Sequence, residues 1–380
     1  MKNNPAVCLS VAALVLVGAF LFGCGGTGTG SILHTPKFLV VTNSANGPAN
    51  PVDVFSINAT TGALAKVAGS PFGSPPLAAA ANSFLWGTVV HPNGHWVYLA
   101  EQFDPDIQGI DLSASSGTPT ALGAEVQNSH TIPWVDAIKI NPKGTHLYAA
   151  DGNGNVSSYK IDQTTGALTA KGPTAVAGAT NLQALVALES FGYVLDAGTK
   201  QIFGAARDSN GNLTPIAGFP IAVASANSLL TIATDRSASF LYVFTSGTDI
   251  FGYSINQTTG ALTLVAGFPI HISGATVQAS FSPDNKFVYT AENTAVRILS
   301  FNSSTGALTE IAGSPVAAAA GTRPNAVVAD PSNQFVYVGD CNNPQVFAYM
   351  RNQTTGALTA VAGSPFASSG GVACGLNVTF

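Results

Sequence analysis

Five acidic residues recur at one position of a repeated segment of the chain, and a ring of carboxylates could do chemistry. Each follows a tyrosine by three residues, and the set is Glu101, Asp151, Asp196, Glu292 and Asp340. Neighbouring carboxylates repel one another, which raises their pKa values and makes them proton acceptors or a seat for a divalent cation. A side chain at a strand end can instead cap the next loop by accepting backbone N–H bonds. Capping suits the three aspartates better than the two glutamates, and both interpretations remain open.

Candidate residues of other types precede predicted strands of the same repeats, namely Trp86, His130, Trp134 and Arg323. An imidazole can accept a proton, a guanidinium can stabilise a developing oxyanion, and the two tryptophans are candidate ligand-binding residues. The sequence contains no recognisable nucleophile motif, metal-ligand cluster or phosphate-binding loop. We therefore expect no cofactor, although the acidic residues leave a divalent cation possible and the identity of any metal unknown.

A recurring turn glycine defines the elements that must position these residues. It stands at positions 62, 117, 166, 211, 260, 306 and 356, at intervals of 45 to 55 residues. Seven units of this length, each with four short strands, predict an all-β fold: a seven-bladed β-propeller of four-stranded antiparallel blades. Six tyrosines hold one position of the second strand in their units, and we expect them to pack between blades.

The order of strands also predicts how the ring closes and where a site lies. The first unit begins at 38–43 with a second strand, and the tail at 373–380 supplies its missing first strand, which removes an exposed edge. Stereotyped turns lie at one end of the blades, and loops of variable content lie at the other. We expect the site at the variable end, and no part in it for His91 and Arg236, which fall in or beside turns at the opposite end.

The first 24 residues differ from the rest of the chain. An apolar run at 6–22 follows Lys2 and is closed by Leu-Phe-Gly-Cys at 21–24. This segment resembles a bacterial lipoprotein signal peptide, which implies lipidation at Cys24, a tether at 25–36 and a propeller at 37–380. It implies an exported protein anchored in the cell envelope, on the periplasmic side of the outer membrane or at the cell surface. An ordinary cleaved signal and an uncleaved membrane anchor are the alternatives.

The cysteines and the net charge limit which compartment and which partners the protein can have. Beyond the first 24 residues only Cys341 and Cys374 remain, and in an exported protein they are expected to form a disulfide. With 14 basic and 19 acidic residues the net charge is −5, and no basic run is present. A nucleic-acid partner is therefore excluded, since binding phosphates requires a basic face. We expect a monomer.

The repeats carry a resemblance to a known family. Segments such as "PNGHWVYLAE", "PDNKFVYTAE" and "PSNQFVYVGD", together with the "TTGAL…VAGSPF" ends, resemble the seven-bladed propeller lactonases. That family includes the propeller-type 6-phosphogluconolactonases and a muconate-lactonising relative, and it borders the propellers named for Tyr-Val-Thr-Asn repeats. The resemblance covers about residues 37–380. Its motifs are structural turns and strands, so it indicates fold more specifically than activity.

Two functions follow as expectations. The resemblance implies lactone hydrolysis at the variable end, where Glu101, Asp151 or His130 would activate water and Arg323 would stabilise the oxyanion. Trp86, Trp134, Asp196, Glu292 and Asp340 would then contact the ligand. A phosphosugar substrate is disfavoured, because an acidic ring repels phosphate. The alternative is a non-catalytic surface propeller that binds a glycan, a peptide or another envelope partner, and the sequence leaves open whether the protein is an enzyme.

Overall fold

The computed structural model describes residues 34–35, 37–44, 52–72, 85–101, 106–128, 137–369 and 371–380, with the side chains of Ser44, Trp86 and Glu101 excepted. The predicted signal peptide, Cys24 and the boundary between tether and propeller lie outside these residues. Every regular element within them is a β-strand. None of the described residues forms a helix long and apolar enough to cross a membrane.

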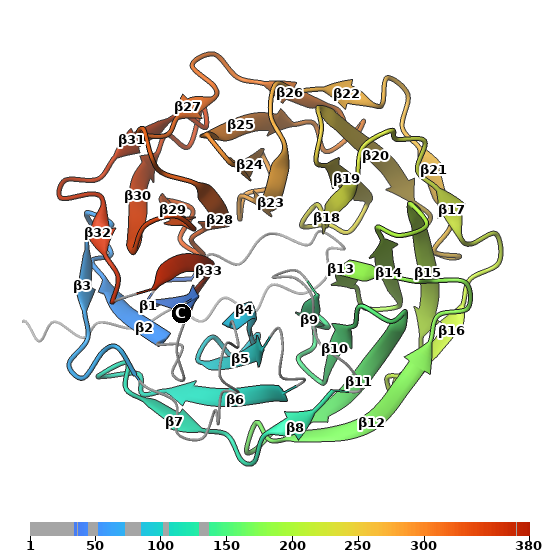
Figure 1. Cartoon of the computed structure of the whole chain (residues 1–380), viewed down its shortest axis with the longest axis horizontal. Coiled ribbons are helices and arrows are strands. Elements are labelled where there is room, and N and C mark those ends of the chain that lie inside the picture. The colour runs from blue at the N-terminus through green and yellow to red at the C-terminus, as the bar shows by residue number, and fades with distance from the viewer. Residues whose placement is uncertain are drawn as a thin grey trace, which may run out of the picture. The chain divides into compact units, whose positions relative to one another are not determined.

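Seven antiparallel sheets are arranged around a central axis, which confirms the predicted propeller (Figure 1). The innermost strands are β4 (Leu85–Val90), β9 (Ile138–Ile140), β13 (Leu182–Ala187), β18 (Leu229–Thr234), β23 (Thr276–Phe281), β28 (Pro324–Ala329) and β33 (Val372–Val378). The second strands are β1 (Phe38–Ser44), β5 (Trp96–Glu101), β10 (His146–Ala150), β14 (Phe191–Asp196), β19 (Phe240–Thr245), β24 (Phe287–Glu292) and β29 (Phe335–Asp340).

The outer half of each blade is built from the third and fourth strands. The third strands are β2 (Val52–Ile57), β6 (Asp106–Leu112), β11 (Asn155–Ile161), β15 (Gln201–Arg207), β20 (Asp249–Ile255), β25 (Ala295–Phe301) and β30 (Gln345–Arg351). The fourth strands are β3 (Leu64–Lys66), β7 (Pro119–Ala121), β12 (Leu168–Ala175), β16 (Leu213–Pro215), β21 (Leu262–Leu264), β26 (Leu308–Glu310) and β31 (Leu358–Ala360).

Within the described residues, five of the seven blades carry a short fifth strand that the sequence pattern does not predict. These strands are β8 (Val126–Gln127), β17 (Ile221–Ala222), β22 (Ile270–His271), β27 (Val316–Ala317) and β32 (Phe366–Ala367). In the β13–β17 blade, β16 pairs with 205–207 of β15, and β17 pairs with 201–202 of the same strand. The fifth strand therefore satisfies the backbone groups that a three-residue fourth strand leaves unpaired.

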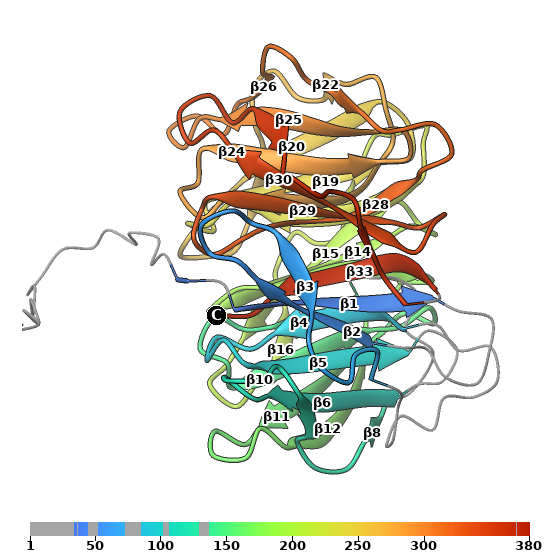
Figure 2. The same cartoon turned by 90° about the vertical axis from the view of Figure 1, so that its left-hand side faces the viewer.

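The ring closes through the last strand of the chain, as the sequence predicts. β33 pairs with β1 in antiparallel register, with Leu39 opposite Val378 and Val41 opposite Leu376. The two strands lie side by side in Figure 2. Their pairing completes a four-stranded sheet in the order β3-β2-β1-β33 and leaves β1 without a free edge.

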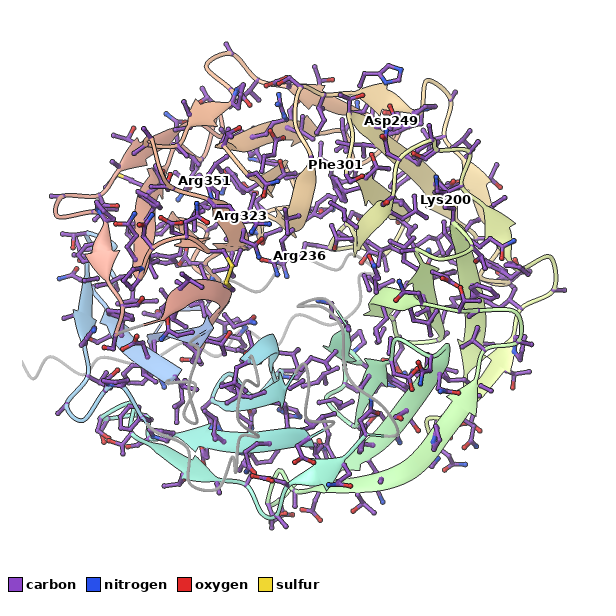
Figure 3. The ribbon with its side chains drawn as sticks, in the orientation of Figure 1. Lys200, Arg236, Asp249, Phe301, Arg323 and Arg351 are labelled. Atoms are coloured by element: carbon purple, nitrogen blue, oxygen red, sulfur yellow. A yellow bond between two sulfur atoms is a disulfide. The ribbon has the colours of Figure 1, made fainter. Side chains whose placement is uncertain are left out.

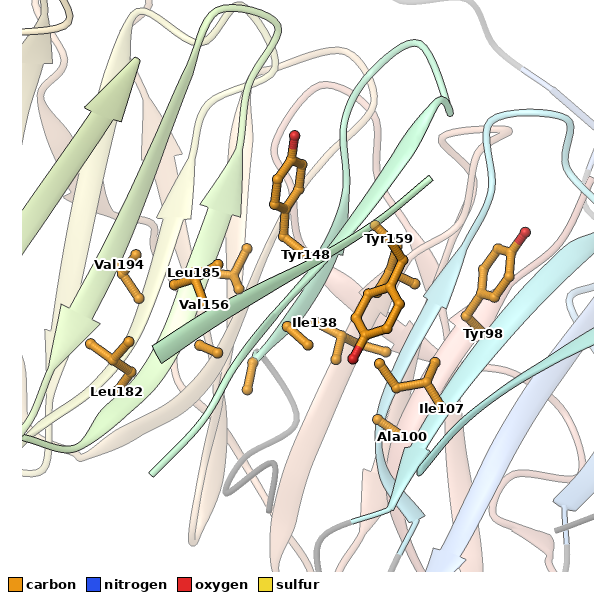
Figure 4. Close-up of a cluster of buried hydrophobic side chains, with 14 of the residues drawn as sticks. Tyr98, Ala100, Ile107, Ile138, Tyr148, Val156, Tyr159, Leu182, Leu185 and Val194 are labelled. Carbon is orange, nitrogen blue, oxygen red and sulfur yellow. The ribbon is translucent and has the colours of Figure 1, made fainter. Parts of the chain in front are cut away.

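Tyrosines link each blade to the next and explain the repeated glycine. Six second-strand phenols donate a hydrogen bond of 2.6 to 3.4 Å to the carbonyl oxygen of the turn glycine in the following blade, from Tyr98 to Gly166 through to Tyr337 to Gly62. All six tyrosines are at most 3% exposed. Figure 4 shows Tyr98 and Tyr148 in a buried apolar cluster whose residues come from three successive blades. Each bond contributes about 1 kcal/mol to the free energy of unfolding.

The turn glycine is also required by packing. Gly62 has a φ of +73°, and a Cβ placed on it would lie 2.4 Å from a ring atom of Phe335. A larger residue would strain the backbone and push the neighbouring blade away. The "TTG" turn, which is the most regularly repeated part of the sequence, therefore has a structural role.

Candidate functional site

Three of the seven second strands have a buried aspartate that caps a loop at or directly after their last residue, at the variable end of the ring. Asp151 is fully buried and accepts a 2.8 Å hydrogen bond from the backbone N–H of Asn155. Asp196, also fully buried, accepts 2.8 Å and 2.7 Å bonds from the backbone N–H groups of Gly198 and Thr180. Its carboxylate thus joins the loop after its own strand to the connection that leads into the blade.

Asp340 repeats this arrangement in the β28–β32 blade. It accepts hydrogen bonds of 2.8 Å from the backbone N–H of Arg323, 2.9 Å from that of Asn342 and 2.8 Å from Nε2 of Gln345. Burial alone raises the pKa of Asp340, but these bonds and one from Asn343 outweigh it and hold the pKa below its usual range. The capping interpretation therefore accounts for all three aspartates.

Glu292 occupies the same register position but lies in a buried ion pair. Its carboxylate accepts bonds of 2.6 Å and 3.1 Å from Nε and Nη2 of Arg297, whose side chain is 1% exposed. Arg297 also binds Glu310 and donates to Ser273. A carboxylate held in this way contributes to the fold, and its oxygens are already occupied.

Arg323 is the candidate cation that faces solvent at this end of the ring. Arg323 is exposed, and its Nε donates a 3.0 Å hydrogen bond to Oδ1 of Asn293. Its backbone is fixed from two sides, because its N–H binds Asp340 and its carbonyl oxygen accepts a 2.8 Å bond from the N–H of Cys341. Figure 3 shows it on the inner side of its blade. Its guanidinium has no acidic partner within the described part of the chain.

The remaining candidates are not placed by the structure. His130 and Trp134 lie outside the described residues. Trp86 belongs to β4 and Glu101 ends β5, where its backbone pairs with Leu85. The structure does not bring Asp151 and Arg323 together, since they belong to blades that are not neighbours in the ring.

A disulfide lies at the same end of the ring. It joins Cys341, directly after β29, to Cys374 in β33, with the two Cα atoms 4.9 Å apart. It therefore ties the closing strand to the adjacent blade, next to the residues that hold Arg323.

The inner strands surround two cavities at the opposite end, where the first turns of the blades lie. One has a volume of about 410 Å³ and is lined by β9, β13, β18 and β23, and the other, of about 270 Å³, lies against β28 and β33. Arg236 borders both, and Figure 3 shows it directed toward the centre of the ring.

The sequence analysis missed this position of Arg236, because a place in a turn does not reveal where the side chain points. A signal was nevertheless present. Four equivalent turns carry proline at this place, at positions 92, 142, 283 and 331, and only this one carries a cation.

His91 lies in a first turn and has a structural role. Its Nε2 lies 2.9 Å from the carbonyl oxygen of Gly144 in the next blade, and burial lowers the pKa of its ring. No group of three or more His, Cys, Asp or Glu side chains within the described residues is arranged to hold a metal ion.

A closed ring of seven blades, with uniform turns at one end and capped variable loops at the other, is a β-propeller scaffold that presents a site. The chain belongs to the seven-bladed β-propeller lactonase family, whose sequence pattern matches residues 48–184 and 232–373.

Solved structures show the same fold. A proposed 6-phosphogluconolactonase from Bacteroides fragilis is 17% identical, with a TM-score of 0.74 over 91% of this chain and 98% of that one. The periplasmic gluconolactonase PpgL of Pseudomonas aeruginosa is 13% identical, with a TM-score of 0.72 over 90% of this chain and 99% of that one. At such identities the likeness concerns the fold alone. No curated protein matches the chain.

Proposed function

We propose that this protein hydrolyses a neutral lactone at the variable end of the ring. The observation that carries the proposal is membership of the lactonase family over both matched segments. Arg323 supports it, because an exposed guanidinium whose backbone is fixed by Asp340 and Cys341 is positioned before substrate arrives.

The proposed reaction adds water across the ring ester. A general base takes a proton from water, the hydroxide attacks the carbonyl carbon, and Arg323 stabilises the oxyanion. The C–O bond of the ring then breaks, the alkoxide takes up the proton, and a hydroxycarboxylate results. Glu101 and His130 are the proposed bases. Asp151 suits the role less well, because its buried carboxylate already accepts bonds from the loop that it caps.

The test is hydrolysis of neutral and phosphorylated lactones by the full-length protein, followed by base uptake at constant pH. Glu101→Gln or His130→Gln should lower kcat by about 100-fold or more, the usual effect of losing a general base. Arg323→Gln should cost about 100-fold in kcat through loss of oxyanion stabilisation. The matched control is Glu189→Gln, at the opposite end of the ring, which should keep the parent rate. Hydrolysis no faster than in buffer would refute the proposal.

A non-catalytic binding role is the second candidate, and the capping aspartates favour it. Asp151, Asp196, Asp340 and Glu292 are engaged by the protein itself, which leaves few free groups at this end for catalysis. A neutral glycan or peptide from the envelope fits such a surface. Ligand-induced increases in Tm without lactone turnover would favour binding over hydrolysis.

We also propose that the protein is exported and lipid-anchored through Cys24, so that the membrane is a partner and the propeller faces the periplasm or the cell exterior. The support is the apolar run that ends in Leu-Phe-Gly-Cys, together with the disulfide between Cys341 and Cys374. Labelled palmitate should enter the wild type and be absent from Cys24→Ser, whereas equal labelling of both would exclude the anchor.

A further inference from the structure

At the end of the ring opposite the proposed lactone site, four of the turns between an innermost and a second strand carry proline, and one carries an arginine. Pro142, Pro283 and Pro331 each occupy the second position of a turn between an innermost and a second strand, and all three line the central cavities. Arg236 holds this position in the β18–β22 blade. Its turn keeps the shape of the others, since Ala238 has the positive φ that Asn285 and Asn333 adopt two residues beyond Pro283 and Pro331. The turn geometry therefore does not require an arginine.

The guanidinium of Arg236 has no acidic partner within the described residues. One hydrogen bond holds it, from Nη2 to the carbonyl oxygen of Phe281 at 2.9 Å. The adjacent carboxylate of Asp235 faces its own turn, where it accepts 2.7 Å bonds from the backbone N–H groups of Ser239 and Phe240. A guanidinium has five N–H donors, so most of those on Arg236 remain available to a ligand.

The surroundings of Arg236 favour an anion beside it. Arg236 is exposed to solvent within the cavities, and desolvation by the protein atoms that line them lowers its pKa. A guanidinium that faces a cavity and has no acidic partner among the described residues can pair with an anion from solution.

The volume and lining of the cavities limit the class of anion. Spaces of about 410 and 270 Å³ admit a small organic molecule. The lining of the cavities includes prolines, Val328 and the hydroxyl-bearing Ser280. Lys139 and Asp235 also border the larger cavity, where the carboxylate of Asp235 is held by its own turn. A planar guanidinium fork matches the two oxygens of a carboxylate, and the prolines and Val328 in the lining offer an apolar surface to the carbon body of such an acid.

We propose that the cavities that Arg236 borders at this end of the ring bind a small organic monocarboxylate, with its carboxylate paired to Arg236. The site lies at the opposite end of the blades from Arg323 and does not depend on the proposed hydrolysis. A ligand bound there contacts β18, β23 and β28 at once and ties three blades together. Binding should therefore raise the Tm of the ring.

The test is calorimetric titration of the full-length protein with benzoate, with benzamide and inorganic phosphate as comparison ligands. We expect saturable binding of benzoate, no binding of uncharged benzamide, and weaker binding of phosphate, which lacks an apolar body. Arg236→Gln should weaken benzoate binding at least about 10-fold, a loss of about 1.4 kcal/mol. Arg236→Lys keeps the charge but loses the fork, so it should recover only part of the affinity.

Three further variants make the result decisive. Arg236→Pro introduces the residue of four equivalent turns and removes the charge. It also removes the backbone N–H that donates a 2.9 Å bond to Asn285, so Arg236→Met is the second charge-free variant and serves if Arg236→Gln fails to fold. Arg323→Gln makes the same charge change at the other end of the ring and should bind benzoate with parent affinity. The inference is overturned if the parent does not bind benzoate below about 10 mM, or if Arg236→Gln and Arg236→Met both bind it as the parent does. It is also overturned if Arg323→Gln is the variant that loses binding.

Discussion

Replacing Glu292 by glutamine tests whether this acid belongs to the fold or to a functional rim. The change removes the charge that neutralises Arg297 while keeping the shape of the side chain. Both partners are buried, with side chains 3% and 1% exposed, and two hydrogen bonds of 2.6 Å and 3.1 Å join them. Burial alone lowers the pKa of Arg297, and its pairing with Glu292 and Glu310 outweighs this and raises the pKa. The guanidinium therefore stays charged, and the variant leaves it partly uncompensated.

The expected loss of stability is about 3 kcal/mol. Removing one partner of a buried ion pair costs about 3 to 5 kcal/mol, because the other charge remains in a medium of low dielectric. The lower end of this range applies, because Glu310 and Ser273 still contact Arg297 in the variant. The matched control is Glu310→Gln, whose side chain is 35% exposed. A partly solvated pair contributes about 1 kcal/mol or less.

Urea denaturation followed by circular dichroism measures both variants against the parent. Glu292→Gln should shift the midpoint strongly, and Glu310→Gln only slightly. A double variant, Glu292→Leu with Arg297→Met, should recover most of the loss, since apolar pairs of similar volume often replace buried ion pairs without cost. The reasoning fails if Glu292→Gln loses less than about 1 kcal/mol, or if it keeps full stability and loses ligand binding.

The other predictions concern the closing disulfide and the response to acid. Replacing Cys341 and Cys374 by serine opens a loop of 33 residues and should lower the free energy of unfolding by about 3 to 4 kcal/mol; a reductant should reproduce the loss in the parent but leave the serine variant unchanged. The pKa of Asp340 is depressed in the folded state, so its contribution to stability is fully present above its ordinary pKa of about 3.9 and is lost as the pH falls through the depressed value. Urea midpoints should therefore fall less steeply between about pH 5 and pH 2 in Asp340→Asn than in the parent, and equal slopes would contradict this role.

The sequence predicts the ring of blades because the residues that recur most regularly in it are those that pack neighbouring blades together. The glycine of each "TTG" turn and the tyrosine of each second strand recur at one spacing because they meet across blades, as Tyr98 and Gly166 do. The closing strand is predictable because the first unit lacks one. The fifth strands are not predictable, since two residues such as Ile221–Ala222 carry no alternation. Their pairing depends on how much of the third strand the fourth leaves free.

The site is predictable only in part, because side-chain partners decide its chemistry. Loop capping follows from an aspartate at a strand end, and Asp196 shows it clearly. The pairing of Glu292 with Arg297 depends on a hairpin that brings β24 and β25 together, which the register of acids alone does not reveal. The position of Arg236 could not be predicted either, because its turn lies beside a cavity only once the blades have closed into a ring.

The composite sheet has a consequence for how the protein is made. β1, β2 and β3 are synthesised first, yet their sheet is completed by β33, the last strand in the order of synthesis. Six blades can assemble from contiguous segments while β1 keeps an unpaired edge. A chain that ends before residue 372 therefore cannot close the ring. Its β1 keeps an unpaired edge with which strands of other chains can pair. Closure of the ring thus waits for the synthesis of β33, and the disulfide between Cys341 and Cys374 then links this strand covalently to the adjacent blade.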